Sequence, residues 1–87
     1  MDEQRMPRNT AIAQTFGFGR ALEHLKYGKK VARTGWNGKD MWIAIKRSTL
    51  ESEMGYDYIY MSPVGGRLVP WLASQTDLLA DDWVLIH

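Results

Sequence analysis

The sequence predicts an α+β fold: an antiparallel sheet of about four to five strands, with one N-terminal helix and a short helix before the last strand. Three observations predict it. An early segment has apolar residues at helical spacing, later segments alternate apolar and polar residues, and turn residues separate them. The chain has 87 residues, the length of a single domain. We place that domain at residues 16–87, after a flexible tail over residues 1–15.

The first helix is predicted by four apolar residues at i, i+3, i+4 and i+7 spacing. They are Phe18, Ala21, Leu22 and Leu25. This spacing predicts a helix over residues 18–27. Gly17 suits its N-cap, and Gly28 suits the position after its C-terminus, where a left-handed backbone is common.

Short alternating segments predict the strands. We expect them at residues 30–34, 41–47, 56–61, 67–71 and 83–86. Asn37-Gly38 predicts a type I′ hairpin turn after the first strand, and Gly65-Gly66 predicts another turn. Pro70 favours an edge strand or a strand end, because proline cannot donate a hydrogen bond to a neighbour. Ser74 and Asp77 have capping-box spacing, which predicts a short helix through about residue 80.

Two strands are expected to divide their side chains between the faces of the sheet. In the segment 41–47, Met41, Ile43 and Ile45 point one way, while Trp42, Ala44 and Lys46 point the other. In the segment 56–61, the tyrosines at 56, 58 and 60 share one face. This tyrosine face could line an interface, since tyrosine is enriched at interfaces.

Composition limits the function classes. The net charge of +1 argues against a binder that neutralises many phosphates of a nucleic acid polymer. The chain lacks cysteine, and His24 and His87 are not at metal-ligand spacing, so we expect neither a metal site nor a cofactor. There is no apolar run near the length of about 20 residues that spans a bilayer, and no signal peptide is apparent at the N-terminus. We therefore expect a soluble intracellular protein.

Catalytic motifs are weak, so we do not expect an enzyme. No serine has the context of a nucleophile elbow, and Gly17-x-Gly19 lacks the preceding strand and third glycine of a dinucleotide fingerprint. Asp81 and Asp82 are adjacent and point apart, so we interpret them as solvated charges rather than an acid–base pair.

Four tryptophans are unusual in a chain of this size. Trp42 and Trp83 lie on strand patterns, which favours the core or a subunit interface. Trp36 follows the first strand beside a turn, where residue chemistry alone leaves two readings open: packing onto the sheet, or stacking with a ligand base. Trp71 lies just before the short helix, whose free N–H groups favour an anion. A nucleotide could place its base on that ring and its phosphate on those amides.

Polar residues nearby could complete such a site. Ser74 and Thr76 could donate hydroxyl hydrogen bonds, and Asp77 could accept from ribose, although capping is its simpler role. Two cations, Arg33 and Lys39, could meet a diphosphate.

Two longer stretches carry a family resemblance. They are Lys29-Lys30-Val31-Ala32-Arg33-Thr34-Gly35-Trp36-Asn37-Gly38-Lys39-Asp40-Met41-Trp42 and Val69-Pro70-Trp71-Leu72-Ala73-Ser74-Gln75-Thr76-Asp77-Leu78-Leu79-Ala80-Asp81-Asp82-Trp83. With Phe18-Gly19-Arg20-Ala21-Leu22, they resemble a small phage and prophage domain family, the second type of Thoeris anti-defence protein. The resemblance covers about residues 18–86. The sequence departs from it at Asp40, where glycine is expected, and in its longer N-terminus.

The resemblance implies a sponge, which is a protein that sequesters a signalling molecule. Such proteins bind glycocyclic ADP-ribose, the cyclic signal of bacterial Thoeris defence, hold it without cleaving it, and assemble as homotetramers with pockets between subunits. We would then expect the protein in the cytoplasm of the bacterial host. Because their motifs match those of the family, the resemblance places Trp36 and Trp71 in the ligand pocket, together with Asn37 and the stretch from Ala73 to Asp77.

Three alternatives stay open. The first is sequestration of guanine-containing cyclic dinucleotides, which some members bind at a separate site. The second is a phage inhibitor that docks onto a host protein through its tyrosine face. The third is a hydrolase of nucleotide signals with Asp77 or Asp81 as base.

Overall fold

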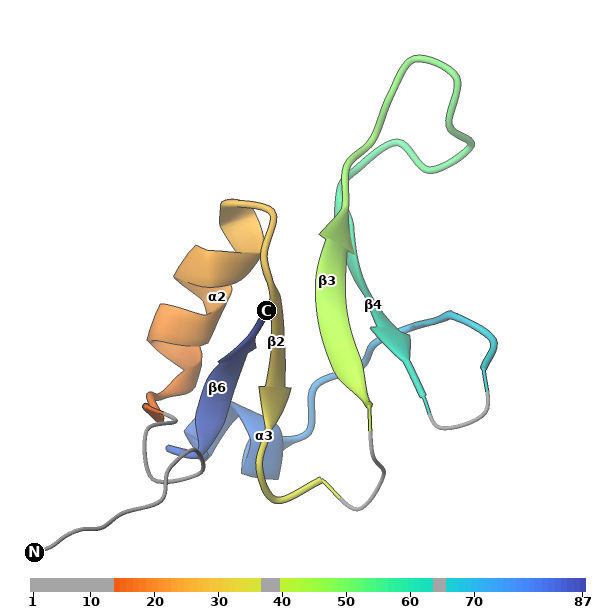
Figure 1. Cartoon of the computed structure of the whole chain (residues 1–87). Helices are drawn as coiled ribbons and strands as arrows, with labels where there is room; N and C mark the ends of the chain where they lie inside the picture. Colours follow the sequence, from red (N-terminus) through yellow and green to blue (C-terminus); the bar gives the residue numbers. More distant parts are fainter. Residues whose placement is uncertain (1–13, 37–39, 64–65) are drawn as a thin grey trace, which may run out of the picture.

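The computed structural model describes residues 14–36, 40–63 and 66–87. It confirms the predicted α+β class: a five-stranded antiparallel sheet has the order β5-β4-β3-β2-β6. A helix precedes the sheet in sequence, and a short helix precedes the last strand (Figure 1). In this part of the chain, no helix has the length and apolar character that crossing a membrane requires.

Helix α2 (Phe18–Lys26) begins where the sequence predicts and ends one residue earlier, with Tyr27 as its C-cap. Gly17 is its N-cap, and Gly28 has a φ of +86°, a conformation that glycine adopts without strain. The backbone N–H of Gly28 donates to the carbonyl of Leu25 at 3.0 Å, which closes the last turn. Ala21 and Leu25 are fully buried, and the helix packs on β2, β3 and β6.

The strands are β2 (Lys30–Arg33), β3 (Trp42–Lys46), β4 (Tyr58–Ser62), β5 (Val69–Pro70) and β6 (Trp83–Ile86). Figure 1 shows β2 between β6 and β3, with α3 (Gln75–Leu79) near the end of β2. Pro70 lies on the edge strand, as predicted. The predicted turn at Asn37-Gly38 lies outside the described residues. At the second predicted turn, Gly66 is described and has a φ of +125°.

Four of the five predicted strands were too long, and two of them, at residues 30–34 and 41–47, by only one or two residues. The segment 67–71 is a strand only at Val69–Pro70. The strand predicted from Tyr56 begins at Tyr58, because Asp57 is engaged in closing the preceding loop. The Asp57 carboxylate accepts from Arg47 Nη1 at 2.8 Å and from the backbone N–H of Ser48 at 2.7 Å. Tyr56 is consequently 86% exposed, and the tyrosine face consists of Tyr58, Tyr60 and Trp42.

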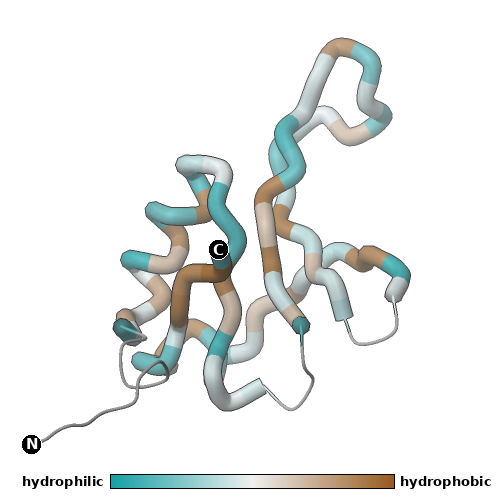
Figure 2. Tube along the Cα trace, in the orientation of Figure 1, coloured by the Kyte–Doolittle hydropathy of each residue, from teal (hydrophilic) through white to brown (hydrophobic). Residues whose placement is uncertain are grey.

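The division of side chains along β3 is as predicted. Ile43 pairs with Val31 and Met61, and it is fully buried on the side that α2 covers. Trp42 is on the opposite side, where its ring meets Tyr60. The fully buried residues of the core are Ala21, Leu25, Val31, Ile43 and Trp83. Hydrophobic residues along β3 and β6 supply part of this core (Figure 2).

Candidate functional site

Four aromatic side chains gather at the start of β6, and we call this group the aromatic cluster. Its centre is Trp83, which is fully buried. The ring centroid of Phe18 lies 5.2 Å from that of Trp83. The centroids of Trp36 and Trp71 lie 5.4 Å and 6.0 Å from it, with interplanar angles of 79° and 88°. Such edge-to-face contacts are a preferred arrangement of aromatic rings. The structure therefore brings together the two tryptophans that the sequence singled out as ligand candidates.

Trp36 and Trp71 reach this cluster from different elements. Trp36 follows β2, and its backbone N–H donates to the carbonyl of Arg33 at 3.2 Å. Trp71 follows β5, and its backbone N–H donates to the carbonyl of Ile59 at 3.0 Å. Both side chains are half-buried against the core. Each indole therefore packs on Trp83 and keeps part of its surface exposed.

Asp77 is the polar centre of the same region, and it is buried. Its Oδ1 accepts from Arg33 Nη1 at 2.9 Å and from Trp36 Nε1 at 3.3 Å. Its backbone carbonyl accepts from Trp83 Nε1 at 3.0 Å. One residue thus satisfies the indole N–H groups of two tryptophans.

The predicted capping box is confirmed. The Asp77 backbone N–H donates to Ser74 Oγ at 3.0 Å, and the Ser74 backbone N–H donates to Asp77 Oδ2 at 3.2 Å. Two N–H groups at the start of α3 therefore already have acceptors, and α3 has five residues. An anion at this helix start stays a prediction. So do ligand contacts from Ala73, which is half-buried, and from the exposed Ser74 and Thr76.

Asp82 completes the network from the other side of Arg33. Its Oδ1 accepts from Arg33 Nε at 2.8 Å, and its Oδ2 accepts from the Gly35 backbone N–H at 2.8 Å and from Thr34 Oγ1 at 3.2 Å. A Cβ at Gly35 would lie 2.9 Å from that Oδ2, so a larger residue there would displace the Asp82 carboxylate. The interpretation of Asp82 as a solvated charge was wrong. Asp81 is exposed.

The network keeps its carboxylates ionised. Burial alone would raise the pKa of Asp77, but hydrogen bonds from Arg33, Ser74 and Trp36 outweigh it and hold that pKa below the usual range. The hydrogen bond from Arg33 lowers the pKa of Asp82, and the two carboxylates raise the pKa of Arg33. At neutral pH the three side chains carry one positive and two negative charges.

Three other predicted positions have different outcomes. Asn37 and Lys39 lie outside the described residues, so their ligand contacts stay predictions. Asp40, where the resemblance expects glycine, has a φ of +64°. That left-handed conformation favours glycine, and aspartate is among the residues that tolerate it. Among residues 14–36, 40–63 and 66–87, no group of three or more histidine, aspartate or glutamate side chains is placed to hold a metal ion.

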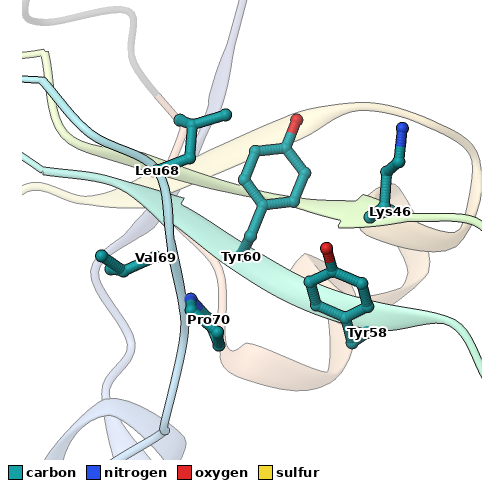
Figure 3. A pocket seen from close by; sticks show the side chains of 6 residues that line it. All are labelled: Lys46, Tyr58, Tyr60, Leu68, Val69 and Pro70. Atoms are coloured by element: carbon teal, nitrogen blue, oxygen red, sulfur yellow. The ribbon is translucent and has the colours of Figure 1, made fainter. Parts of the chain in front are cut away.

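A separate pocket lies on the tyrosine face, away from the aromatic cluster. Figure 3 shows the tyrosine hydroxyls and the Lys46 ammonium pointing the same way beside the edge strand. The lining residues are Lys46, Tyr58, Tyr60, Leu68, Val69 and Pro70. Its volume of about 240 Å³ is below the range of about 300–1,000 Å³ for typical small-molecule sites. In one chain, it is too small to enclose a nucleotide.

Sequence comparison identifies the family. A family described as the Thoeris anti-defense 2-like domain matches residues 16–86. A protein named Thoeris anti-defense 2, from Bacillus phage SP01, is 38% identical over 82 residues, which covers 79% of this chain and 92% of that relative. The resemblance carried by the two tryptophan-containing stretches is therefore confirmed. The chain belongs to the Thoeris anti-defense 2-like family, a family of anti-defence proteins.

Proposed function

We propose that this protein is a non-catalytic sponge, which binds glycocyclic ADP-ribose and withholds it from the effector of Thoeris defence in the host cytoplasm. Family membership supports the anti-defence role, and one observation supports the mechanism. Trp36 and Trp71, distant in sequence, contact the same buried Trp83 and stay half-exposed. A base stacked on such a ring gains about 1–3 kcal/mol.

Affinity arithmetic extends the proposal to assembly. A sponge needs a Kd of about 1 nM or lower, which corresponds to about −12 kcal/mol. Stacking on both Trp36 and Trp71 would supply about 2–6 kcal/mol, so other contacts and enclosure must supply the rest. Pockets formed between subunits of a homotetramer would exclude water from the ligand. The proposed protein is therefore such a homotetramer, in which Asn37 and Lys39 also lie beside the ligand.

The electrostatics favour holding a ligand over cleaving it. A general base works best when its pKa is near the operating pH. Burial raises the pKa of Asp77, but the hydrogen bonds from Arg33, Ser74 and Trp36 lower it by more, so that this pKa lies below the usual range. Asp77 would therefore be a weak base for hydrolysis at neutral pH.

Mass spectrometry of ligands released by heat tests the proposal. The protein is incubated with glycocyclic ADP-ribose, cyclic ADP-ribose and guanine-containing cyclic dinucleotides, separated from free ligand, and heated. We expect intact glycocyclic ADP-ribose from the wild type and almost none from Trp36→Ala or Trp71→Ala. Tyr27→Ala is the matched control, because it also removes an aromatic ring, and Tyr27 is 83% exposed at the end of α2.

Two outcomes would contradict the sponge. Recovery of a ring-opened product, with many turnovers per protein, would indicate a hydrolase. Retention of none of these ligands, combined with stable capture of a host protein, would indicate an interaction module. Light scattering on every variant separates loss of assembly from loss of ligand contacts.

A further inference from the structure

Trp36 is hydrogen-bonded to a polar network that consists of Asp77, Arg33 and Asp82. We propose that Asp77 and Arg33 are positioning residues, which hold the Trp36 indole in its binding orientation without touching the ligand. This inference rests on the proposed function, because it specifies how the same site is built. It assigns to Asp77 and Arg33 a different task from the ribose and phosphate contacts that the sequence suggested.

The Trp36 ring is fixed at two points. An indole has one N–H donor, so its bond to Asp77 Oδ1 at 3.3 Å determines which edge of the ring points inward. The edge-to-face contact with Trp83, at 5.4 Å and 79°, determines the tilt of the ring. An aromatic platform fixed before the ligand arrives loses little conformational freedom on binding.

Asp77 is itself held at several points. Its Oδ2 accepts from the Ser74 backbone, its backbone N–H donates to Ser74 Oγ, and its carbonyl accepts from Trp83 Nε1. The residue that orients Trp36 therefore also anchors the ring on which Trp36 packs. A carboxylate that already accepts three hydrogen bonds has little capacity left for a ribose hydroxyl.

Arg33 joins the two sides of this network. Its Nε donates to Asp82 and its Nη1 donates to Asp77, so one guanidinium spans two carboxylates. Because two negative charges face one positive charge, the group does not attract a diphosphate. Its side chain is 16% exposed. These contacts connect the C-terminal end of β2 to the start of α3, the two segments next to Trp36.

The experiment combines two variants with two measurements. Asp77→Asn replaces a carboxylate by an amide, whose single oxygen cannot serve both Ser74 and the pair formed by Arg33 and Trp36. Arg33→Lys keeps the positive charge, but one ammonium lacks the planar fork that spans both carboxylates. Heteronuclear NMR follows the indole N–H resonances and their hydrogen exchange, and calorimetry measures binding of glycocyclic ADP-ribose. Asp81→Asn is the matched control, since Asp81 is exposed.

We expect both variants to displace the Trp36 indole resonance, to speed its hydrogen exchange, and to weaken binding by about tenfold or more, as loss of a hydrogen bond to a charged group does. The Trp42 resonance and the Asp81→Asn protein should be unaffected. Arg33→Lys retains a cation in the network, so it provides a folded test if Asp77→Asn does not fold.

Binding that weakens while the Trp36 resonance stays in place would overturn the proposal, since Asp77 or Arg33 would then contact the ligand directly. A displaced resonance with undiminished binding would overturn it as well. If the wild type itself binds no glycocyclic ADP-ribose, the proposed function fails, whereas the spectra of the free protein still decide whether Asp77 and Arg33 orient Trp36.

Discussion

The two faces of the sheet hold their tryptophans differently. In the aromatic cluster, the indole N–H groups of Trp36 and Trp83 both have acceptors on Asp77. On the tyrosine face, Trp42 meets Tyr60 at 5.8 Å, and the Lys30 ammonium lies 4.2 Å above its ring. The first arrangement fixes ring orientation through directional hydrogen bonds in a buried region. The second depends on less directional contacts at a half-exposed surface. The surroundings of each tryptophan therefore determine how firmly its ring is held.

The largest predicted difference between the faces comes from truncating their tryptophans. Trp83→Ala should lower the free energy of unfolding by about 3–5 kcal/mol, because it leaves a cavity in a fully buried cluster. Trp42→Ala should cost less than half as much, since Trp42 is half-exposed. Urea denaturation at a fixed protein concentration measures both. Equal losses would mean that the two faces bury their rings to the same extent in solution.

Acid should remove the stability that the ion pairs of Arg33 with Asp77 and Asp82 give to the region of the aromatic cluster. Burial opposes ionisation of Asp77, but the hydrogen bonds from Arg33 and its neighbours hold the folded-state pKa values of Asp77 and Asp82 below the ordinary value for aspartate. Stability from these groups is therefore fully present at neutral pH and is lost as the pH falls below about 4, through the unfolded values and on toward the folded ones. The unfolding free energy measured by urea titration should decline over that interval.

Asp82→Asn isolates part of this acid response. It removes the charge that the hydrogen bond from Arg33 stabilises, so at pH 7 it should cost about 1.5–3 kcal/mol, toward the lower end because the Asp82 side chain is 29% exposed. Its stability should also fall less steeply in acid than that of the wild type. An unchanged slope would show that Asp82 does not contribute to the acid response.

Local elements of this fold were predictable, and contacts between distant segments were not. The i, i+3, i+4, i+7 pattern placed α2, and the spacing of Ser74 and Asp77 placed α3, because both signals act within one or two turns. The bond between Arg33 and Asp82 joins residues 49 positions apart. It follows from the pairing of Arg33 with Trp83 across β2 and β6, which alternation within single strands does not reveal.

In the candidate site, too, individual residues were predictable from the sequence, whereas their contacts with distant segments were not. Sequence motifs singled out Trp36 and Trp71, but not that both would pack on Trp83. That contact depends on how β5 and β6 are arranged relative to β2. Asp82 was missed because adjacent aspartates resemble a solvated pair. Its position one residue before a strand that pairs with Arg33 was the available signal.

A smaller effect is expected from the cap that holds Asp77. Ser74→Ala removes the acceptor of the Asp77 backbone N–H and should cost about 1 kcal/mol. Gln75→Ala is the control, since Gln75 is exposed in the same turn and takes no part in the capping box. Thermal unfolding compares the two. If Ser74→Ala also displaces the Trp36 indole resonance, then the cap contributes to ring orientation as well as to helix stability.

The smallest effect is expected on the tyrosine face. Lys30→Met removes the cation above Trp42 and should cost about 0.5 kcal/mol, the usual size of a cation–π contact at an exposed position. Lys29→Met is the matched control, because Lys29 is exposed and adjacent but is not the cation over that ring. A double-mutant cycle with Trp42→Leu measures the coupling between the two side chains. A coupling of about 2 kcal/mol or more, the size of a desolvated cation–π contact, would show that the cation holds the Trp42 ring more firmly than an exposed contact does. A coupling of about 0.5 kcal/mol would confirm that this contact holds the Trp42 ring weakly.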